Sequence, residues 1–327
     1  MFSFSYSEPV SVQSMFEGWN PPFHGGEIGL TYDHAEVGLR WRDWRFGLLW
    51  RYDYLLEFSA DTAEIFYRTE NRLPLQAGRT YELRIEALNT ASRGLRLGRA
   101  WRITPELRFA AGISWLRGYR LTDGWLRGRA RAVSEKDFDF SFETDYSYSR
   151  DVIFGREVDG ADGWGYSIDA GLEWQATDRL ALSAKVIDLA GRIDWREAPY
   201  TTAMASSETK TYDADGYVRY KPLARGFEGY RSFSQTLPRK IFLSSAFRLD
   251  GSTELLAEYR DFSVRGFAEF GLGRCWGTFG CGRLLLNPAD RALRLGYRGH
   301  GIRLELASDN IDFSRARLLS LVLSIGS

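Results

Sequence analysis

Three histidines and two cysteines are the residues of this sequence best suited to metal binding or to nucleophilic chemistry. The histidines, His24, His34 and His300, are not spaced as metal ligands, either with one another or with the cysteines. A structural zinc site needs about four ligands close together, and the two cysteines have no further ligand nearby. The sequence therefore predicts no metal site, and no other cofactor is expected.

The two cysteines, Cys275 and Cys281, lie in the segment CWGTFGC, which also contains Gly277 and Gly280. Glycines between cysteines at this spacing favour a tight hairpin whose tip is closed by a disulfide. Such a bond persists in an oxidising compartment. Two unpaired thiols are the alternative, and we predict the disulfide.

Two rows of opposite charge form a third candidate group. The members of each row stand on one parity of a segment, and they are Arg127, Arg129 and Arg131 in the first and Asp139, Glu143 and Asp145 in the second. Side chains of one parity share a face of a strand, and hairpin neighbours bring equal faces together. We therefore expect the arginines to meet the acids. Exposed ion pairs contribute only about 0–1 kcal/mol, so such a ladder matters most inside a confined polar lumen.

The segments that carry these residues alternate in polarity with period two. In FDFSFETDYSYS (138–149), one parity is almost wholly aromatic and the other is acidic or polar. The same alternation occurs in 44–58, 81–87, 107–115, 166–174 and 314–325, whereas helical periodicity is rare. The chain is therefore predicted to be almost entirely antiparallel β.

Connections between these segments are of two kinds. Tight turns are expected at 103–106, 175–179 and 249–253, and long polar loops at 150–163 and 197–237. Within 179–195, the parity of the apolar residues changes at Val186–Ile187, which predicts a β-bulge that restores the faces. Residues 1–25 are less regular and are predicted to form a cap or plug.

Composition excludes two protein classes. The 43 basic residues balance the 43 acidic ones, which argues against a nucleic-acid-binding protein. Charged residues make up 26%, and no segment approaches the roughly 20 apolar residues that a membrane helix needs, so a helical membrane protein is excluded as well.

Large aromatic residues stand near the ends of the apolar faces, as in the interfacial girdles of membrane barrels. They include Trp44, Trp115, Trp125, Trp164, Trp174 and Trp195.

With these repeats of about ten residues, apolar on one face and polar on the other, the sequence resembles bacterial outer-membrane β-barrel proteins of the porin or fatty-acid-transporter-like type. The last segment, RARLLSLVLSIGS, is similar to barrel-closing C-terminal strands, with Leu319, Leu321, Leu323 and Ile325 on one face. Residues 237–262 resemble a strand–turn–strand unit of such barrels. The resemblance covers residues 26–327.

The resemblance implies a closed antiparallel transmembrane β-barrel with a polar lumen, located in the bacterial outer membrane. We expect 14–18 strands, with 16 as the central value, since single-chain bacterial barrels have even strand numbers. Residues 26–327 would form the barrel, and the segment 1–25 would stand apart from it. The implied partners are the lipid bilayer and lipopolysaccharide, with other components of an outer-membrane assembly as further candidates.

Four functions remain open at this stage. The first is a pore or a translocation or anchoring channel across the outer membrane. The second is a sealed barrel that serves as a partner in a secretion or cell-surface assembly. The third is an outer-membrane lipid hydrolase with a serine beside His24 or His34, and the fourth is a soluble propeller or repeat shell.

Overall fold

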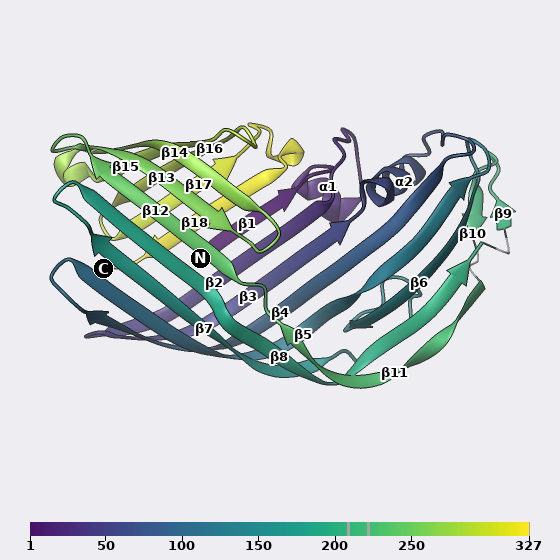
Figure 1. The fold of residues 1–327 in the computed structure, drawn as a ribbon, viewed down its shortest axis with the longest axis horizontal. Helices are drawn as coiled ribbons and strands as arrows, with labels where there is room; N and C mark the ends of the chain where they lie inside the picture. Colours follow the sequence, from purple (N-terminus) through teal and green to yellow (C-terminus); the bar gives the residue numbers. More distant parts are fainter. Residues whose placement is uncertain (208–209, 221–222, 327) are drawn as a thin grey trace.

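The computed structural model describes residues 1–207, 210–220 and 223–326. Fourteen of the described strands form one closed antiparallel ring (Figure 1). In spatial order they are β1 (Phe2–Ser7), β2 (Ile28–Trp41), β3 (Trp44–Phe58), β4 (Thr80–Arg102), β5 (Leu107–Ala132), β7 (Asp162–Gln175), β8 (Leu180–Ser206), β12 (Lys240–Arg248), β13 (Thr253–Asp261), β14 (Gly266–Cys275), β15 (Cys281–Asn287), β16 (Ala292–Gly299), β17 (Ile302–Ser308) and β18 (Leu318–Ile325). The predicted closed antiparallel barrel is confirmed, and its strand number lies at the lower bound of the predicted range.

The first strand closes the ring. β1 pairs with β18 on one side and with β2 on the other, in registers that set Phe4 opposite Ser320 and Tyr32. The first 25 residues, expected as a cap or plug, therefore include a barrel strand, and only residues 8–25 lie outside it. The short alternation FSFSYS carries this strand, with Phe2, Phe4 and Tyr6 turned toward the interior.

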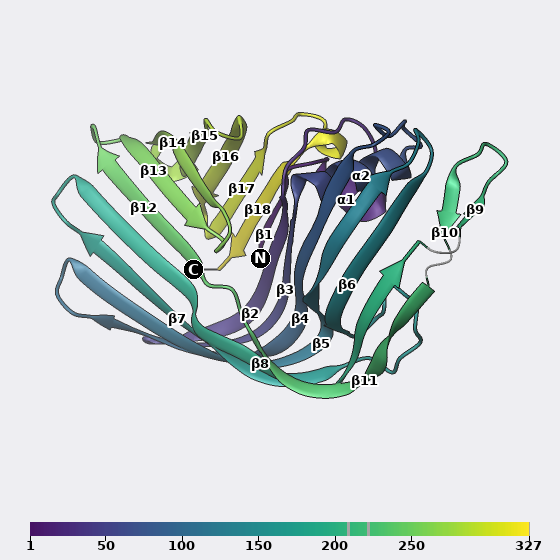
Figure 2. The same ribbon diagram turned by 45° about the vertical axis from the view of Figure 1, so that its right-hand side comes forward.

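The strands differ greatly in length. β4, β5 and β8 have 23, 26 and 27 residues, whereas β12 to β18 have seven to ten. The long strands therefore rise beyond the closed ring on one side of the molecule, where β6 (Phe138–Tyr148) lies between β5 and β8, and β11 (Leu223–Thr236) pairs with β8. We call β6, β11 and the parts of β4, β5 and β8 beside them the extension (Figure 2).

Of the two long loops expected, one is confirmed and the other is wrong. Residues 197–237 are mostly strand, because they contain the end of β8, the hairpin of β9 (Lys210–Tyr212) and β10 (Val218–Tyr220), and β11. Small and polar residues in YTTAMAS and GFEGYRSFSQT hide the alternation there. Residues 149–161 do link β6 to β7 without a strand, but they lie against β6, where Asp151 accepts a hydrogen bond from Tyr146 at 2.6 Å.

Two α-helices cover the face of the sheet that points away from the lumen. α1 (Val12–Glu17) begins after Ser11 and α2 (Ala60–Glu70) after Ser59, and each serine accepts a hydrogen bond from a backbone N–H of the first turn. Ile65 of α2 packs on Tyr81 and Ala130 of the extension. Two short 3-10 helices, η1 (Gly277–Phe279) and η2 (Phe313–Arg315), complete the described helices. None of the described helices has the length and apolarity to cross a membrane.

A bulge is present at the predicted position, Val186–Ile187, but it adds two residues where one was expected, so it does not exchange the faces of the strand. The three residues 187–189 of β8 stand opposite Asp169 of β7, and Asp188 has a φ of 57°. The bulge does not gather the apolar residues on one face, however, because Val186 lies on the outward parity while Ile193 is buried in the interior. The reason is that the interior beside this part of β8 is itself apolar.

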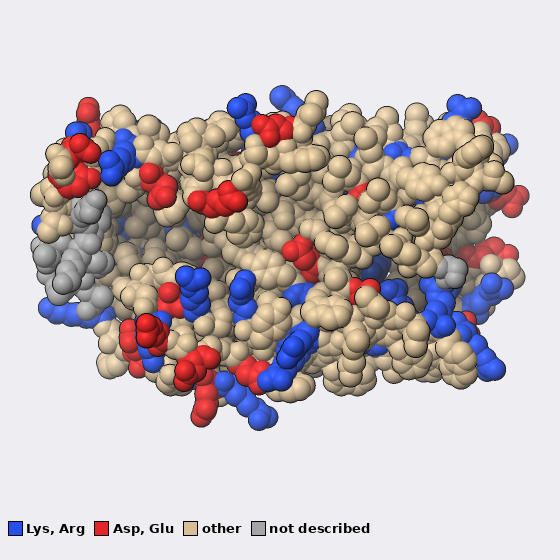
Figure 3. Space-filling view, turned by 180° about the vertical axis from the view of Figure 1, so that it is seen from behind, with Lys and Arg blue, Asp and Glu red and all other residues tan. Residues whose placement is uncertain are grey.

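The outward face of the ring is apolar. Leucine, tryptophan and phenylalanine side chains of the ring strands are exposed there, for example Leu39 at 76% and Leu295 at 58%. Seen from behind, the molecule has a wide stretch of uncharged surface, and charged side chains gather mostly along its lower margin and at its two ends (Figure 3). In outer-membrane barrels an exposed apolar band of this kind faces the hydrocarbon core of the bilayer.

The two ends of the barrel differ. The strands are joined by short turns at 42–43, 103–106, 176–179, 249–252, 276–280 and 300–301, all on the end where β18 finishes and β1 begins. We call this the turn end. α1, α2, the extension and the hairpin of β9 and β10 lie at the opposite end (Figure 1). In outer-membrane barrels short turns are periplasmic and longer connections are extracellular.

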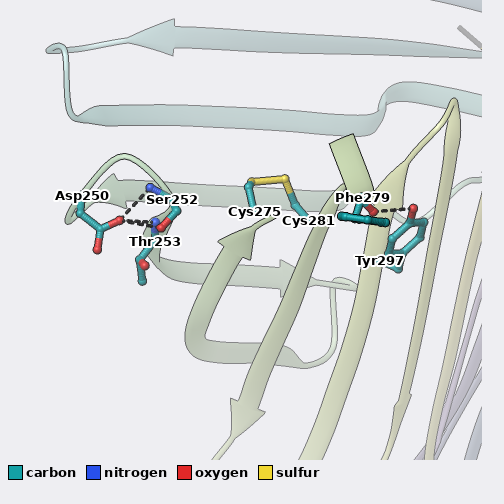
Figure 4. Close-up of a disulfide and its surroundings, with 7 residues drawn as sticks. All are labelled: Asp250, Ser252, Thr253, Cys275, Phe279, Cys281 and Tyr297. Carbon is teal, nitrogen blue, oxygen red and sulfur yellow. Dashed lines mark hydrogen bonds between the residues drawn. A yellow bond between two sulfur atoms is a disulfide. The ribbon is translucent and has the colours of Figure 1, made fainter. Parts of the chain in front are cut away.

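The disulfide predicted between Cys275 and Cys281 is present, and the two cysteines are paired in register on β14 and β15 (Figure 4). Gly277 and Gly280 have positive φ angles of 53° and 93°, so the tight tip of this hairpin favours glycine at both positions. Tyr297 donates a hydrogen bond of 2.9 Å to the carbonyl of Phe279, which holds the tip against β16.

Peptide mapping of purified protein checks this bond. We expect the peptide that contains Cys275 and Cys281 to resist alkylation until a reductant is added, because both sulfur atoms are bonded. No other cysteine is present to confuse the result. Alkylation of both thiols in fresh native protein would contradict the disulfide.

Candidate functional site: the lumen

The lumen is closed because its opposite walls touch. Aromatic rings from β1 meet rings from the far side: Phe4 stacks on Phe262 at 4.5 Å and meets Phe267 at 4.9 Å between centroids. An eight-stranded barrel is just filled by its side chains, and the diameter grows with strand number. A round barrel of 14 strands would therefore keep these rings apart, so the cross-section is flattened.

A cluster of four charged side chains, which we call the central cluster, lies in this interior. Its members come from three strands and are Arg51 and Asp53 of β3, Asp188 of β8 and Lys240 of β12. The Arg51 guanidinium donates to Asp188 at 2.7 and 2.5 Å and also to Asp53, while Lys240 Nζ donates to Asp188 at 3.0 Å and to Asp53. All four side chains are at most 5% exposed.

The central cluster is electrically neutral and pins opposite walls together. β3 and β8 are not neighbours in the ring, yet Arg51 joins them directly. Tyr32 of β2 offers its ring to both cations, with Lys240 Nζ at 4.7 Å and the Arg51 guanidinium carbon at 5.4 Å from the centroid. Buried charges are tolerated only when paired and hydrogen-bonded, which is the arrangement seen here.

A second polar network lines the wall formed by β13 to β17. Arg294 bridges Glu269 at 3.0 Å and Glu305 at 3.2 Å, and Arg260 also pairs with Glu269. Arg283 connects Glu305 to Glu258 of β13, at 3.1 and 2.6 Å. The row crosses neighbouring strands on their inward face, so these charges are paired along the wall and do not line an open channel.

A third network stands beside the central cluster. Arg96 of β4 pairs with Asp169 of β7, and Glu36 of β2 pairs with Arg45 at 2.9 Å and lies 3.4 Å from His34. His34, Arg96 and Asp169, together with Arg51 and Ser114, line a small cavity of about 10 Å³. This volume is close to the minimum that a single water molecule needs, so the lumen is almost completely filled here.

On the other side of the central cluster the interior is apolar again. Leu49, Leu116, Ile193 and Trp195 are buried against one another. The Trp195 indole donates to the side-chain oxygen of Gln235 at 3.1 Å, and Thr90 donates to the same oxygen at 2.5 Å. β4, β8 and β11 are therefore joined across the interior where the closed ring gives way to the extension.

The predicted charge ladder lies on the extension. Arg127 stands opposite Glu143 and Arg131 opposite Asp139, whereas Arg129 faces Ser141, and Asp145 faces Trp125. This face continues the lumen face, but the three arginines are exposed. The ion pairs run to other strands: Arg127 reaches Glu86 at 3.4 Å, Lys210 reaches Asp139 at 2.6 Å, and Arg231 reaches Asp145 at 2.6 Å.

The three candidate histidines lie in different parts of the fold. His34 points into the lumen beside Tyr32 and Glu36, His24 lies in the segment between β1 and β2, and His300 occupies the turn between β16 and β17. The ring nitrogens of His34 lie near Tyr32 Oη and the Glu36 carboxylate. In the described part of the chain, no three His, Cys, Asp or Glu side chains are grouped to hold a metal ion.

The central cluster was missed by sequence reasoning, although a signal exists. In WRYDYLL, Arg51 and Asp53 interrupt an otherwise apolar strand, and Lys240 is one of few lysines in the chain and begins a strand. Alternation alone places Arg51 and Asp53 on the polar face. The contact between Arg51 and Asp188 depends on the exact form of the bulge and on the flattening of the ring. Neither can be read from the polarity pattern of one sequence.

The loop over the extension is also anchored by a buried acid. Asp151 accepts hydrogen bonds from Tyr146 and from the backbone N–H groups of Ile153, Phe154 and Arg156, at 2.6 to 3.1 Å. Burial alone would raise the pKa of the Asp151 carboxyl, but these hydrogen bonds outweigh it and hold the pKa below its usual range. The residues 149–161 are therefore fastened over the outward face of β6.

No model of a known protein family matches the chain, and no curated protein matches it. Among solved structures, the toluene transporter TodX of Pseudomonas putida is 12% identical with a TM-score of 0.45, covering 99% of this chain and 86% of that one. The toluene transporter TbuX of Ralstonia pickettii is 10% identical with a TM-score of 0.33, covering 94% of this chain and 71% of that one.

A third similar structure is the ferric yersiniabactin uptake receptor FyuA of Yersinia pestis. It is 9% identical with a TM-score of 0.31, and the match covers 93% of this chain and 43% of that one. Similarities at this level carry no residue role, substrate or partner over to this chain. What the chain itself shows is the architecture of an outer-membrane β-barrel with a closed lumen.

Proposed function

We propose that this protein is a sealed outer-membrane β-barrel that anchors the extension at the cell surface as a platform within a larger assembly. The observation that carries the proposal is the central cluster, because four buried, mutually paired charges join opposite walls where an open pore would need water. The turn end would face the periplasm and the extension the outside.

Two further features support an anchoring role. The apolar outward face lies on the closed ring, whereas the extension has charged residues on its lumen-side face and helices or a loop on its other face. The barrel thus provides a lipid-embedded base, and the extension is a large water-exposed sheet that the base does not need for closure. Lipid and lipopolysaccharide would be the partners of the base.

Reconstitution into planar lipid bilayers tests the sealed state. We expect folded protein, recognised by heat-modifiable migration on a gel, to insert and to give no steady ionic conductance. Removing side chains that block the interior, in the double variant Arg51→Ala and Trp195→Ala, should allow measurable ion flow. Stable open-channel steps from the unaltered protein would contradict the sealed barrel.

A gated channel is the second candidate, and the polar network beside the central cluster favours it, because Glu36 contacts both His34 and Arg96, and Arg96 contacts Asp169. His34 and the paired charges of this network could bind a polar solute if the network rearranged to admit it. In this case the unaltered protein would conduct or admit a solute only under a stimulus, such as low pH or a transmembrane voltage. A silent bilayer under both conditions would leave the sealed anchor as the function.

A further inference from the structure

The extension ends in a strand edge that lacks a partner in the described part of the chain. β11 pairs with β8 along one side, in a register that runs from Leu223 to Thr236, and it is the last strand of the sheet in that direction. Figure 2 shows β11 near the margin of the extension, and the one described strand that it pairs with is β8. The short strand β12 pairs with residues 180–187 of β8, and β11 pairs with the later residues 192–206 of the same strand.

An edge of this kind is a binding surface by its backbone chemistry. β11 has 14 residues, and along one side every second residue presents its N–H and C=O groups unpaired. Natural proteins protect long edges with proline, charged side chains, β-bulges or a covering segment. β11 contains no proline or lysine, and its charged residues are Arg225, Glu228 and Arg231. Its one bulge lies between Arg231 and Phe233, so residues 223–230 form a regular edge.

The side chains beside the edge favour a partner of defined polarity. On the lumen-side face, Phe227 is 77% exposed, Arg225 is also exposed, and Met204 of β8 stands opposite Arg225 and is exposed as well. Arg231 on the same face already pairs with Asp145. The edge thus offers one apolar contact at Phe227 and one arginine, Arg225, that makes no ion pair with a described residue.

We infer that β11 is a docking edge that binds an extended polypeptide segment by strand addition, with apolar and acidic residues alternating along that segment. The backbone of the segment would complete the unpaired N–H and C=O groups, its acidic side chain would face Arg225, and its apolar side chain would cover Phe227. The inference rests on the proposed function, because it names how the platform holds its partner.

A second copy of this chain fits the edge less well. On the lumen-side face, the described residues of β11 from Arg225 to Gln235 include no acid. Two β11 edges brought together would therefore give Arg225 no opposite charge to pair with, whichever register they adopt. A partner strand that carries acids satisfies both the backbone and Arg225.

The experiment uses the full chain in lipid nanodiscs and two synthetic, fluorescein-labelled peptides of equal length. One peptide alternates valine with glutamate, and the other alternates valine with lysine. We expect the glutamate peptide to bind roughly fivefold more tightly by fluorescence anisotropy. Hydrogen exchange of the amides within residues 223–236 should slow when it is bound. Equal binding of both peptides, or binding without slowed exchange in β11, would overturn the inference.

A charge reversal at the edge sharpens the test. Arg225→Glu should invert the preference, so that the lysine peptide binds better. Arg129→Glu is the matched control, because Arg129 is exposed on the same face but lies on β5, three strands away. An equal inversion by both variants would reduce the effect to net charge and would refute the docking edge. A conducting barrel would instead contradict only the sealed anchor, since peptide binding is read independently of ion flow.

Discussion

Replacing Arg51 with alanine should lower the free energy of unfolding by about 3–5 kcal/mol, because it leaves Asp53 and Asp188 buried with one cation where they now share two. Removing one partner of a buried ion pair exposes the remaining charge to the full cost of desolvation. Urea unfolding of the protein in lipid vesicles, followed by tryptophan fluorescence, measures the change. A loss this large would be a substantial part of the stability of an ordinary domain.

Two companion variants decide the cause. Arg127→Ala removes the same side chain from an exposed position on the extension and should change stability by less than about 0.5 kcal/mol. The double variant Arg51→Met and Asp53→Leu removes one charge of each sign, and it should cost less than Arg51→Ala because Lys240 and Asp188 remain as a pair. If Arg51→Ala and Arg127→Ala had equal effects, the central cluster would not hold the walls together.

Placing arginine on the outward face of the ring should have the second large effect. Leu295→Arg puts a charge at the middle of β16, on the exposed apolar face, where lipid would surround it. The expected cost is about 2–4 kcal/mol near the bilayer midplane. We expect a lower folded fraction in lipid vesicles, measured by heat-modifiable migration.

The control for this variant is Val133→Arg. Val133 is also exposed, at 52%, but it lies in the turn between β5 and β6 at the far end of the extension. An arginine there stays in water and should leave folding nearly unchanged. Equal tolerance of both substitutions would place Leu295 in water and would contradict the membrane-embedded ring.

The alternation of apolar and polar residues along the sequence predicted the barrel well. Alternation in 44–58 and 107–115 has period two, and this period alone decides which residues face outward. It failed where small residues break the contrast, as in YTTAMAS of β8, which was expected to be a loop. It also passed over FSFSYS, since a strand of six residues gives little signal next to an irregular segment.

The interior was much less predictable, because it depends on which walls meet. The parity of Arg51 is readable from its neighbours, but its contact with Asp188 joins strands that are not adjacent in the ring. In the same way, the arginines of β5 were expected to pair with the acids of β6, and Arg231 of β11 binds Asp145 instead. A hairpin sets the register of its two strands. A long arginine or lysine side chain, however, can form an ion pair with an acid on any strand within its reach.

The bulge in β8 also sets how this segment tolerates insertions and deletions. Ile187, Asp188 and Leu189 stand opposite one residue of β7, so two residues are in excess there. Losing a single residue would exchange the two faces of the following stretch, driving Arg192 and Asp194 inward and Trp195 outward. Losing two would keep the faces but remove Asp188 from Arg51 and Lys240. Gene variants that change length by one codon in this stretch should therefore be rarer than those that change it by two.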